Sequence, residues 1–136
     1  MAIELFVDTS AWYVLAISST PQHRKVSDAL RQRVQRGARV VTTNLIVAET
    51  HALLSRRASR TVALAFVREV KRSPNQVVAS SAEYEDLAVT DWLEKFDDQD
   101  FSLTDAVSFA VMTDRGVREA LALDHHFSVA GFLVIP

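Results

Sequence analysis

The sequence predicts an α/β protein with three layers, in which helices cover both faces of a central, parallel, five-stranded sheet that is doubly wound. Short runs of β-branched and aromatic residues alternate with helical stretches along the whole chain, which is typical of a parallel sheet. The 136 residues are 49% hydrophobic and 24% charged, and a chain of this size buries about two-thirds of its unfolded surface. No linker, repeat or low-complexity segment interrupts it, so we expect one domain over residues 1–136.

Each element in the first half of the chain has a local signal. Strands are expected where β-branched and aromatic residues run together, and helices where apolar residues recur three or four positions apart. Pro21 favours a helix start and Gly37 a helix end. The expected order is strand 3–7, helix 9–17, helix 21–36, strand 39–42 and helix 44–57.

The second half continues the alternation. Pro74 limits one helix, the acidic stretch 82–96 has an amphipathic pattern, and Gly116 closes a helix that begins at Ser102. The expected order is helix 60–72, strand 76–79, helix 82–96, helix 102–114, strand 120–123 and strand 132–135.

Composition excludes several classes of site. The chain has no cysteine, which removes disulfides, thiol nucleophiles and Cys-ligated metal sites. Its three glycines lie far apart, so no glycine-rich phosphate loop can form. The longest uncharged run, 9–23, is shorter than the about 20 residues of a membrane span, and the first residues lack the basic character of a secretory signal. We expect a soluble, cytoplasmic protein without a membrane association.

Charge is distributed unevenly along the chain. Residues 1–75 hold 12 Lys and Arg against 5 Asp and Glu, whereas residues 76–136 hold 3 against 12, within a net charge of −2. The basic half suits a polyanionic partner, and the alternative is two solvated faces of opposite sign.

Acidic residues are expected at one edge of the sheet. In an open parallel sheet ligands bind at the carboxyl ends of the strands. Asp8 and Asp124 directly follow expected strands, Asp105 opens the helix that leads into a strand, and Glu49 lies one to two turns inside another helix. Asp8, Asp124 and Asp105 have a second interpretation as helix caps, with Asp105 completing a capping box with Ser102. Glu49 falls between Leu45 and Leu53 on the expected apolar stripe, where a lone carboxylate is unfavourable.

Four carboxylates in one cleft raise one another's pKa, and a divalent cation relieves their repulsion. Oxygen ligands without Cys or a set of His favour Mg²⁺ or Mn²⁺ over zinc. These ions support phosphate chemistry. The sequence therefore predicts a Mg²⁺ or Mn²⁺ site.

Four segments of the chain resemble the motifs of PIN-domain ribonucleases, and the likeness is greatest to VapC-type toxins of toxin–antitoxin pairs. The segments are FVDTSAW (6–12), TNLIVAE (43–49), SLTDAVSFA (102–110) and ALDHHF (122–127). Many relatives carry a further Asp just before the Phe of the last segment, where this chain has His126. We expect His125 and His126 to be exposed loop residues rather than ligands.

The resemblance implies an endoribonuclease that depends on Mg²⁺ or Mn²⁺ and leaves a 5′-phosphate and a 3′-hydroxyl. It implies that Asp8, Glu49, Asp105 and Asp124 are the catalytic, metal-holding residues. It also implies that the Ser10 and Thr104 hydroxyls line the site. For Ser10 and Thr104, hydrogen bonding at a helix start is the other interpretation. The resemblance also implies a homodimer and a VapB-like antitoxin whose tail enters the acidic groove.

The basic half then offers candidates for RNA phosphate contacts. They lie on two successive helices beyond Glu49: Arg56, Arg57, Arg60, Arg68, Lys71 and Arg72. Trp12 and Trp92 have the area to stack on bases, although packing in the core or in a dimer is the favoured interpretation. The main alternative function is a catalytically inactive PIN-like module that binds RNA or protein.

Overall fold

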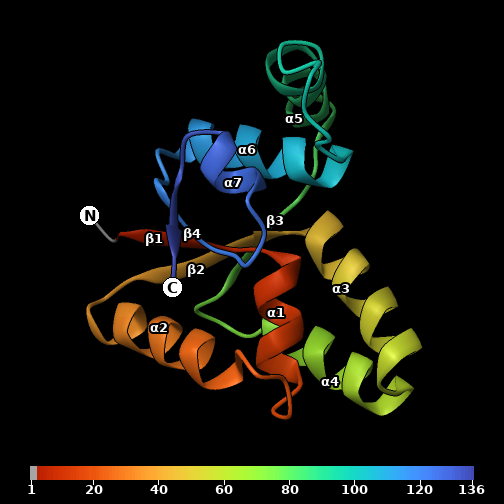
Figure 1. The fold of residues 1–136 in the computed structure, drawn as a ribbon, viewed down its shortest axis with the longest axis vertical. Coiled ribbons are helices and arrows are strands. Elements are labelled where there is room, and N and C mark those ends of the chain that lie inside the picture. Colours follow the sequence, from red (N-terminus) through yellow and green to blue (C-terminus); the bar gives the residue numbers. More distant parts are fainter. Residues whose placement is uncertain (1–2) are drawn as a thin grey trace.

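A five-stranded, wholly parallel sheet forms the centre of the computed structural model, which describes residues 3–136. The strands lie in the order β3-β2-β1-β4-β5, so the chain starts in the middle of the sheet and builds outward in both directions (Figure 1). This confirms the predicted fold class. The strands are β1 (Glu4–Val7), β2 (Arg39–Thr43), β3 (Gln76–Val78), β4 (Glu119–Leu121) and β5 (Leu133–Ile135).

Helices cover both faces of the sheet, as predicted (Figure 1). On one face α3 packs along α4 and α1 packs on α2 and α3, and on the other face α6 packs along α5 and the π-helix η1. The first group consists of α1 (Thr9–Ala16), α2 (His23–Gln35), α3 (Asn44–Arg57) and α4 (Arg60–Val70). The second consists of α5 (Ala82–Leu87), η1 (Ala88–Leu93), α6 (Leu103–Arg115) and α7 (His126–Val129).

The single helix expected over 82–96 is wrong in its second half. The α-helix ends at Leu87 and a π-helix follows, in which the Glu94 N–H donates to the Val89 carbonyl at 2.9 Å. The Trp92 ring in this wider turn packs against Phe96 and Phe109, with ring centroids 5.3 and 5.0 Å apart. Aromatic packing therefore accompanies a turn that a simple helical period does not describe.

The connection between the last two strands also differs from expectation. Strand β4 ends at Leu121 rather than at residue 123, and the four-residue helix α7 follows Asp124 and His125. A helix of one turn is too short to show a hydrophobic period, and the cap interpretation of Asp124 was the one indication of it. The other expected boundaries differ from the observed ones by at most three residues.

The core lies on both sides of the sheet and is rich in aromatic rings. Phe6 of β1 packs on Phe127 of α7, and Phe127 packs on Phe109 of α6 at 5.0 Å in a T-shaped arrangement. Trp12 is buried and contacts Phe66, and Trp92 is half-buried within the aromatic cluster around Phe109. Both tryptophans therefore pack in the core, as favoured by the sequence.

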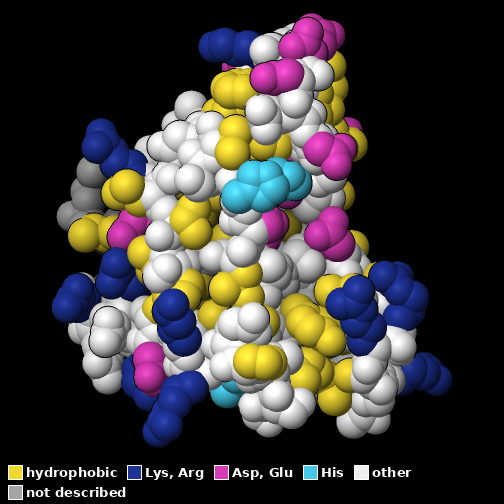
Figure 2. All heavy atoms as spheres, viewed as in Figure 1, with side chains coloured by type: hydrophobic (Ala, Val, Ile, Leu, Met, Phe, Trp, Pro, Cys, Tyr) yellow, Lys and Arg dark blue, Asp and Glu magenta, His cyan; other side chains and the backbone are white. Residues whose placement is uncertain are grey.

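The uneven charge of the sequence becomes an uneven surface. Lys and Arg gather over α2 and over α3 and α4, whereas Asp and Glu gather on the end that carries α5 and η1 (Figure 2). Among residues 3–136, no helix combines the length and apolar character needed to cross a bilayer.

Candidate metal centre

Asp8 is the most deeply buried acid of the site. It follows β1 directly, its side chain is 4% exposed, and its N–H donates to the Leu121 carbonyl at the end of β4 at 3.1 Å. Asp8 Oδ2 caps α1 by accepting from the Ser10 N–H at 3.2 Å and from the Ser10 hydroxyl at 2.7 Å. The Ser10 Oγ in turn accepts from the Leu123 N–H at 2.9 Å. Ser10 thus ties Asp8 to the loop after β4, and the capping interpretation of Asp8 is confirmed.

Asp105 lies in the first turn of α6 and forms the predicted capping box. Its Oδ2 accepts from the Ser102 N–H at 3.2 Å, and its own N–H donates to the Ser102 Oγ at 3.0 Å. The neighbouring Thr104 is half-buried in the same turn. The box fixes one carboxylate oxygen and leaves Oδ1 without a hydrogen bond within the described residues.

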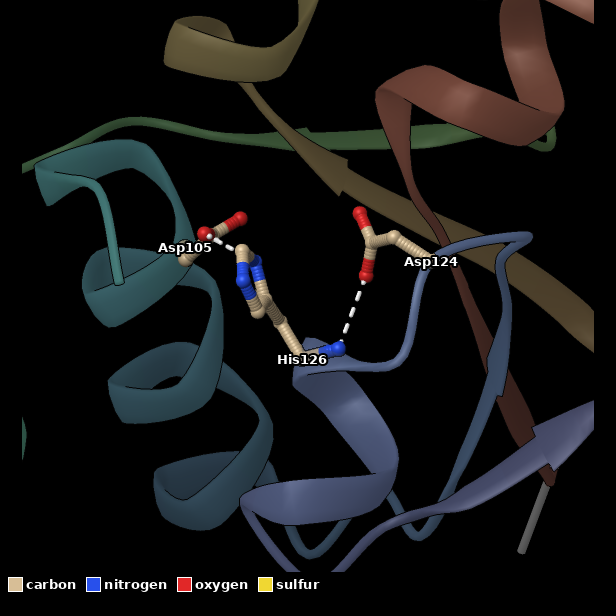
Figure 3. A group of neighbouring side chains, drawn as sticks. All are labelled: Asp105, Asp124 and His126. Carbon is tan, nitrogen blue, oxygen red and sulfur yellow. Dashed lines mark hydrogen bonds and ion pairs between the residues drawn. The ribbon is translucent and has the colours of Figure 1, made fainter. Parts of the chain in front are cut away.

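Asp124 lies between β4 and α7, where it comes close to Asp105 and to a histidine. Asp124 Oδ1 accepts from the His126 N–H at 3.0 Å, and His126 Nδ1 lies 3.0 Å from Asp105 Oδ2 (Figure 3). One ligand atom from each of the three side chains lies within 4.8 Å of the others. We call Asp105, Asp124 and His126 the compact group.

At this edge of the sheet, burial and a neighbouring negative charge both disfavour the ionised form of a carboxylate. The pKa of Asp8 is raised from 3.8 to about 7, chiefly by burial and then by the nearby charge of Asp124, while hydrogen bonds from Ser10 and from the Thr9 backbone oppose the shift. Three acids from three elements thus lie together, and among residues 3–136 no Lys or Arg forms an ion pair with any of them. A hard divalent cation fits such a donor set, because oxygen ligands are those it prefers and its charge removes the repulsion.

Two of the four predicted acids lie outside the compact group. One is Asp8, which is close enough to Asp124 for that charge to raise its pKa, and the other is Glu49. It is exposed in the second turn of α3, and the expectation that it lies on the buried stripe is wrong. The buried face of α3 is offset from the expected one: its residues are Ile46, Val47, Thr50 and Leu54. The start of α3 directly follows β2, so Glu49 remains on the side of the molecule where the carboxyl ends of the strands lie.

His126 is the residue of the site that sequence reasoning missed. His125 is exposed, as expected, but His126 begins α7, its side chain is only 21% exposed, and it contacts Asp105. The expectation of an exposed loop residue is wrong, because His126 begins the single helical turn of α7. A helix beginning two residues after Asp124 turns the His126 ring back toward α6 (Figure 3).

The basic residues expected to contact RNA all lie on the surface, and one of them, Arg72, pairs with Glu69 at 3.6 Å. Arg56 and Arg57 end α3, Arg60 begins α4, and Arg68 lies in the last turn of α4. The Arg57 guanidinium lies over the Tyr13 ring, 5.8 Å from its centroid. Within residues 3–136 none of these four forms an ion pair, which leaves their charges available to a partner.

Residues 5–133 match the PIN domain family. The chain is 34% identical over 131 residues to the 23S rRNA-specific endonuclease VapC20 of Mycobacterium tuberculosis. The matched region covers 96% of this chain and 97% of that protein. The crystal structure of VapC20, described as a sarcin-ricin loop cleaving toxin, superposes with a TM-score of 0.86 over 97% of this chain and 99% of that one.

More distant structures share the fold alone. VapBC2 of Rickettsia felis, bound to a DNA fragment from its promoter, has a TM-score of 0.71 at 10% identity over 97% of each chain. FitAcB of Neisseria gonorrhoeae has a TM-score of 0.67 at 13% identity over 97% of this chain and 96% of that one. The motifs, the parallel sheet with its acidic edge, and these similarities lead to one assignment: the chain belongs to the PIN-domain family of nucleases.

Proposed function

We propose that the protein is a divalent-metal-dependent endoribonuclease of the VapC type. The observation that carries the proposal is the convergence of Asp8, Asp105 and Asp124 at one edge of the sheet, where the pKa of Asp8 is raised to about 7. Carboxylates so arranged destabilise the ion-free fold, and a bound Mg²⁺ or Mn²⁺ relieves the repulsion. The full-length similarity to VapC20 supports the same activity.

Different residues of the chain are proposed to hold the ion and to fix the orientation of the residues that hold it. Asp8, Glu49, Asp105 and Asp124 are the proposed metal-holding and catalytic carboxylates. Ser10 fixes Asp8 by two hydrogen bonds. Thr104, in the turn that carries Asp105, is proposed to line the site. The bound ion supplies charge neutralisation at the phosphate and activation of a water nucleophile.

RNA is the proposed substrate, and 23S rRNA is the first target to test because the relative VapC20 is named for it. The arginines of α3 and α4 are proposed to bind phosphates on either side of the cleaved bond: Arg56, Arg57, Arg60 and Arg68. Contacts of this kind position the strand without reading its bases.

The proposed protein partners are a second copy of the chain and a VapB-like antitoxin. The support for the antitoxin comes from similarity to VapC20, which is described as a toxin, and the second copy is what the family resemblance implies. An antitoxin arginine placed at the acidic edge would satisfy the carboxylates with paired hydrogen bonds, in place of a metal ion.

The test is cleavage of total RNA by the purified protein with Mn²⁺ or Mg²⁺, beside an Asp105→Asn variant. We expect discrete products with 5′-phosphate ends from the wild type and from an Asp97→Asn control, which changes an exposed acid in the loop after η1. We expect no products from Asp105→Asn or in the presence of a chelator. RNA binding without cleavage by the wild type would contradict the proposal and favour the inactive binding module.

A further inference from the structure

The compact group contains a nitrogen donor among its carboxylates. His126 Nδ1 lies 3.0 Å from Asp105 Oδ2, and its position allows one ligand atom each from His126, Asp105 and Asp124 to lie within 4.8 Å of one another. Two neighbouring donors around one octahedral ion, each about 2.1 Å from it, lie about 3 Å apart. The spacing between the imidazole nitrogen and the carboxylate oxygen therefore suits a shared ion.

The orientation of the His126 ring is fixed from several sides. Phe101 packs against it edge-on, with centroids 5.5 Å apart and planes at 85°. The His126 backbone N–H is bonded to Asp124 Oδ1, and its ring lies 4.7 Å from that of His125. A ring held in this way presents the same nitrogen to the carboxylates without a further loss of side-chain freedom.

We infer that His126 is a ligand of the proposed metal site and that its nitrogen shifts the preference of the site from Mg²⁺ toward Mn²⁺ and later first-row ions. Mg²⁺ strongly prefers oxygen ligands, whereas imidazole favours transition ions. His126 Nδ1 and Asp105 Oδ2, which now contact each other, would both hold the ion. The inference rests on the proposed function, since it concerns the same site.

The competing role for His126 is that of a positioning residue, which only donates a hydrogen bond to Asp105. That role predicts a general loss of affinity on substitution, equal for Mg²⁺ and Mn²⁺. A ligand role predicts a change in the ratio of the two affinities, because only one of the ions gains from nitrogen. The two roles also differ in whether a nitrogen nucleus is coupled to the bound ion.

The experiment measures metal binding by the full chain after treatment with a chelator, at about pH 8, where imidazole is neutral. Calorimetric titrations with Mg²⁺ and with Mn²⁺ give the two dissociation constants for the wild type, His126→Asp, His126→Gln and a His125→Gln control. We expect the preference for Mn²⁺ over Mg²⁺ to fall about tenfold or more in both His126 variants and to stay unchanged in the control.

A second measurement does not depend on comparing affinities. Electron spin-echo spectroscopy of Mn²⁺ bound to the wild type is expected to show coupling to a directly bound nitrogen, and His126→Asp is expected to lack it. An unchanged preference in the variants, or no nitrogen coupling in the wild type, would overturn the inference while RNA cleavage stood. A wild type that binds neither ion and cleaves no RNA would instead overturn the proposed function itself.

Discussion

The acidic residues at the two edges of the sheet differ in whether an arginine pairs with them. At the amino edge, Glu4 begins β1 and receives two hydrogen bonds from Arg115, at 3.0 and 2.7 Å. Glu119 begins β4 and receives two from Arg33, at 3.2 and 3.1 Å. At the carboxyl edge, Asp8 and Asp124 lie close enough to repel each other.

The difference separates carboxylates that pair with an arginine from carboxylates that have no Lys or Arg partner within residues 3–136. The paired hydrogen bonds that Arg115 donates to Glu4 raise the pKa of Arg115 above its usual value, so the charges at the amino edge are compensated within the chain. At the carboxyl edge no Lys or Arg in the described part of the chain pairs with Asp8, Asp105 or Asp124, and of the basic side chains only His126 lies beside one of them, which fits the proposed metal site. The comparison can be tested by changing one edge at a time.

The largest expected effect is on catalysis at the carboxyl edge. Asp124→Asn keeps the shape of the side chain and removes a charge, and we expect RNA cleavage to fall about a thousandfold or more, because a held divalent ion supplies several kcal/mol. Glu119→Gln removes a charge at the amino edge and is expected to leave the cleavage rate nearly unchanged. Rates on one RNA under single-turnover conditions measure both, and equal losses would contradict the comparison.

The next effect is a dependence of stability on pH that originates at Asp8. In the metal-free fold Asp8 keeps its proton up to about pH 7, whereas the unfolded chain releases it near 3.8. The folded state therefore binds more protons between these values, and stability falls as the pH rises through this window. The contribution of Asp8 to the loss is up to about 4 kcal/mol, at about 1.4 kcal/mol for each pH unit from 3.8 to about 7.

Urea unfolding of the wild type and of Asp8→Asn, with chelator and at several pH values, isolates this contribution. We expect the difference in unfolding free energy to shift in favour of Asp8→Asn as the pH rises. Added Mn²⁺ is expected to reverse the difference, since it binds only the charged site of the wild type. A difference that is independent of pH would show that Asp8 is ionised throughout.

Most of the fold was predictable because its signals are local and repeated. Strands of β-branched residues and helices bounded by Pro21, Gly37 and Gly116 place almost every element within three residues of the observed bounds. The π-turn around Trp92 and the single turn of α7 were not predictable, since both depend on packing between distant segments.

The site was predictable in part, for the same reason. Parallel topology alone brings the loop after β1 and the loop after β4 to one edge, which accounts for Asp8 and Asp124. The orientation of a side chain on a helix depends on which face of the helix is buried. The expected apolar stripe of α3 included Glu49, whereas the buried face of the helix does not. His126 depends on the unpredicted α7, so its contact with Asp105 was not foreseen.

A smaller effect is expected at the amino edge. Arg115→Met leaves the Glu4 carboxylate, which is 16% exposed, without its partner, and also removes a bond from Arg115 to Gln76. We expect a loss of about 1–3 kcal/mol in unfolding free energy, smaller than for a fully buried pair because water reaches the site. The double variant Arg115→Met with Glu4→Leu is expected to recover part of the loss. Neither the single nor the double variant is expected to alter metal affinity.

The smallest expected effect concerns the arginines that lack a carboxylate partner. Arg33 and Arg115 are held by glutamates, whereas Arg60 and Arg68 on α4 are exposed and unpaired within residues 3–136. If they bind phosphates, Arg60→Gln and Arg68→Gln each weaken RNA binding about two- to fivefold and make the slope of log affinity against log salt shallower by about 0.7.

The matched control is Arg36→Gln, which removes an exposed charge after α2 and is expected to change neither the affinity for RNA nor its salt dependence. Fluorescence anisotropy with the inactive Asp124→Asn background measures binding without cleavage. A loss that varied strongly with RNA sequence would argue against phosphate contacts, because the charge of the backbone is the same at every step.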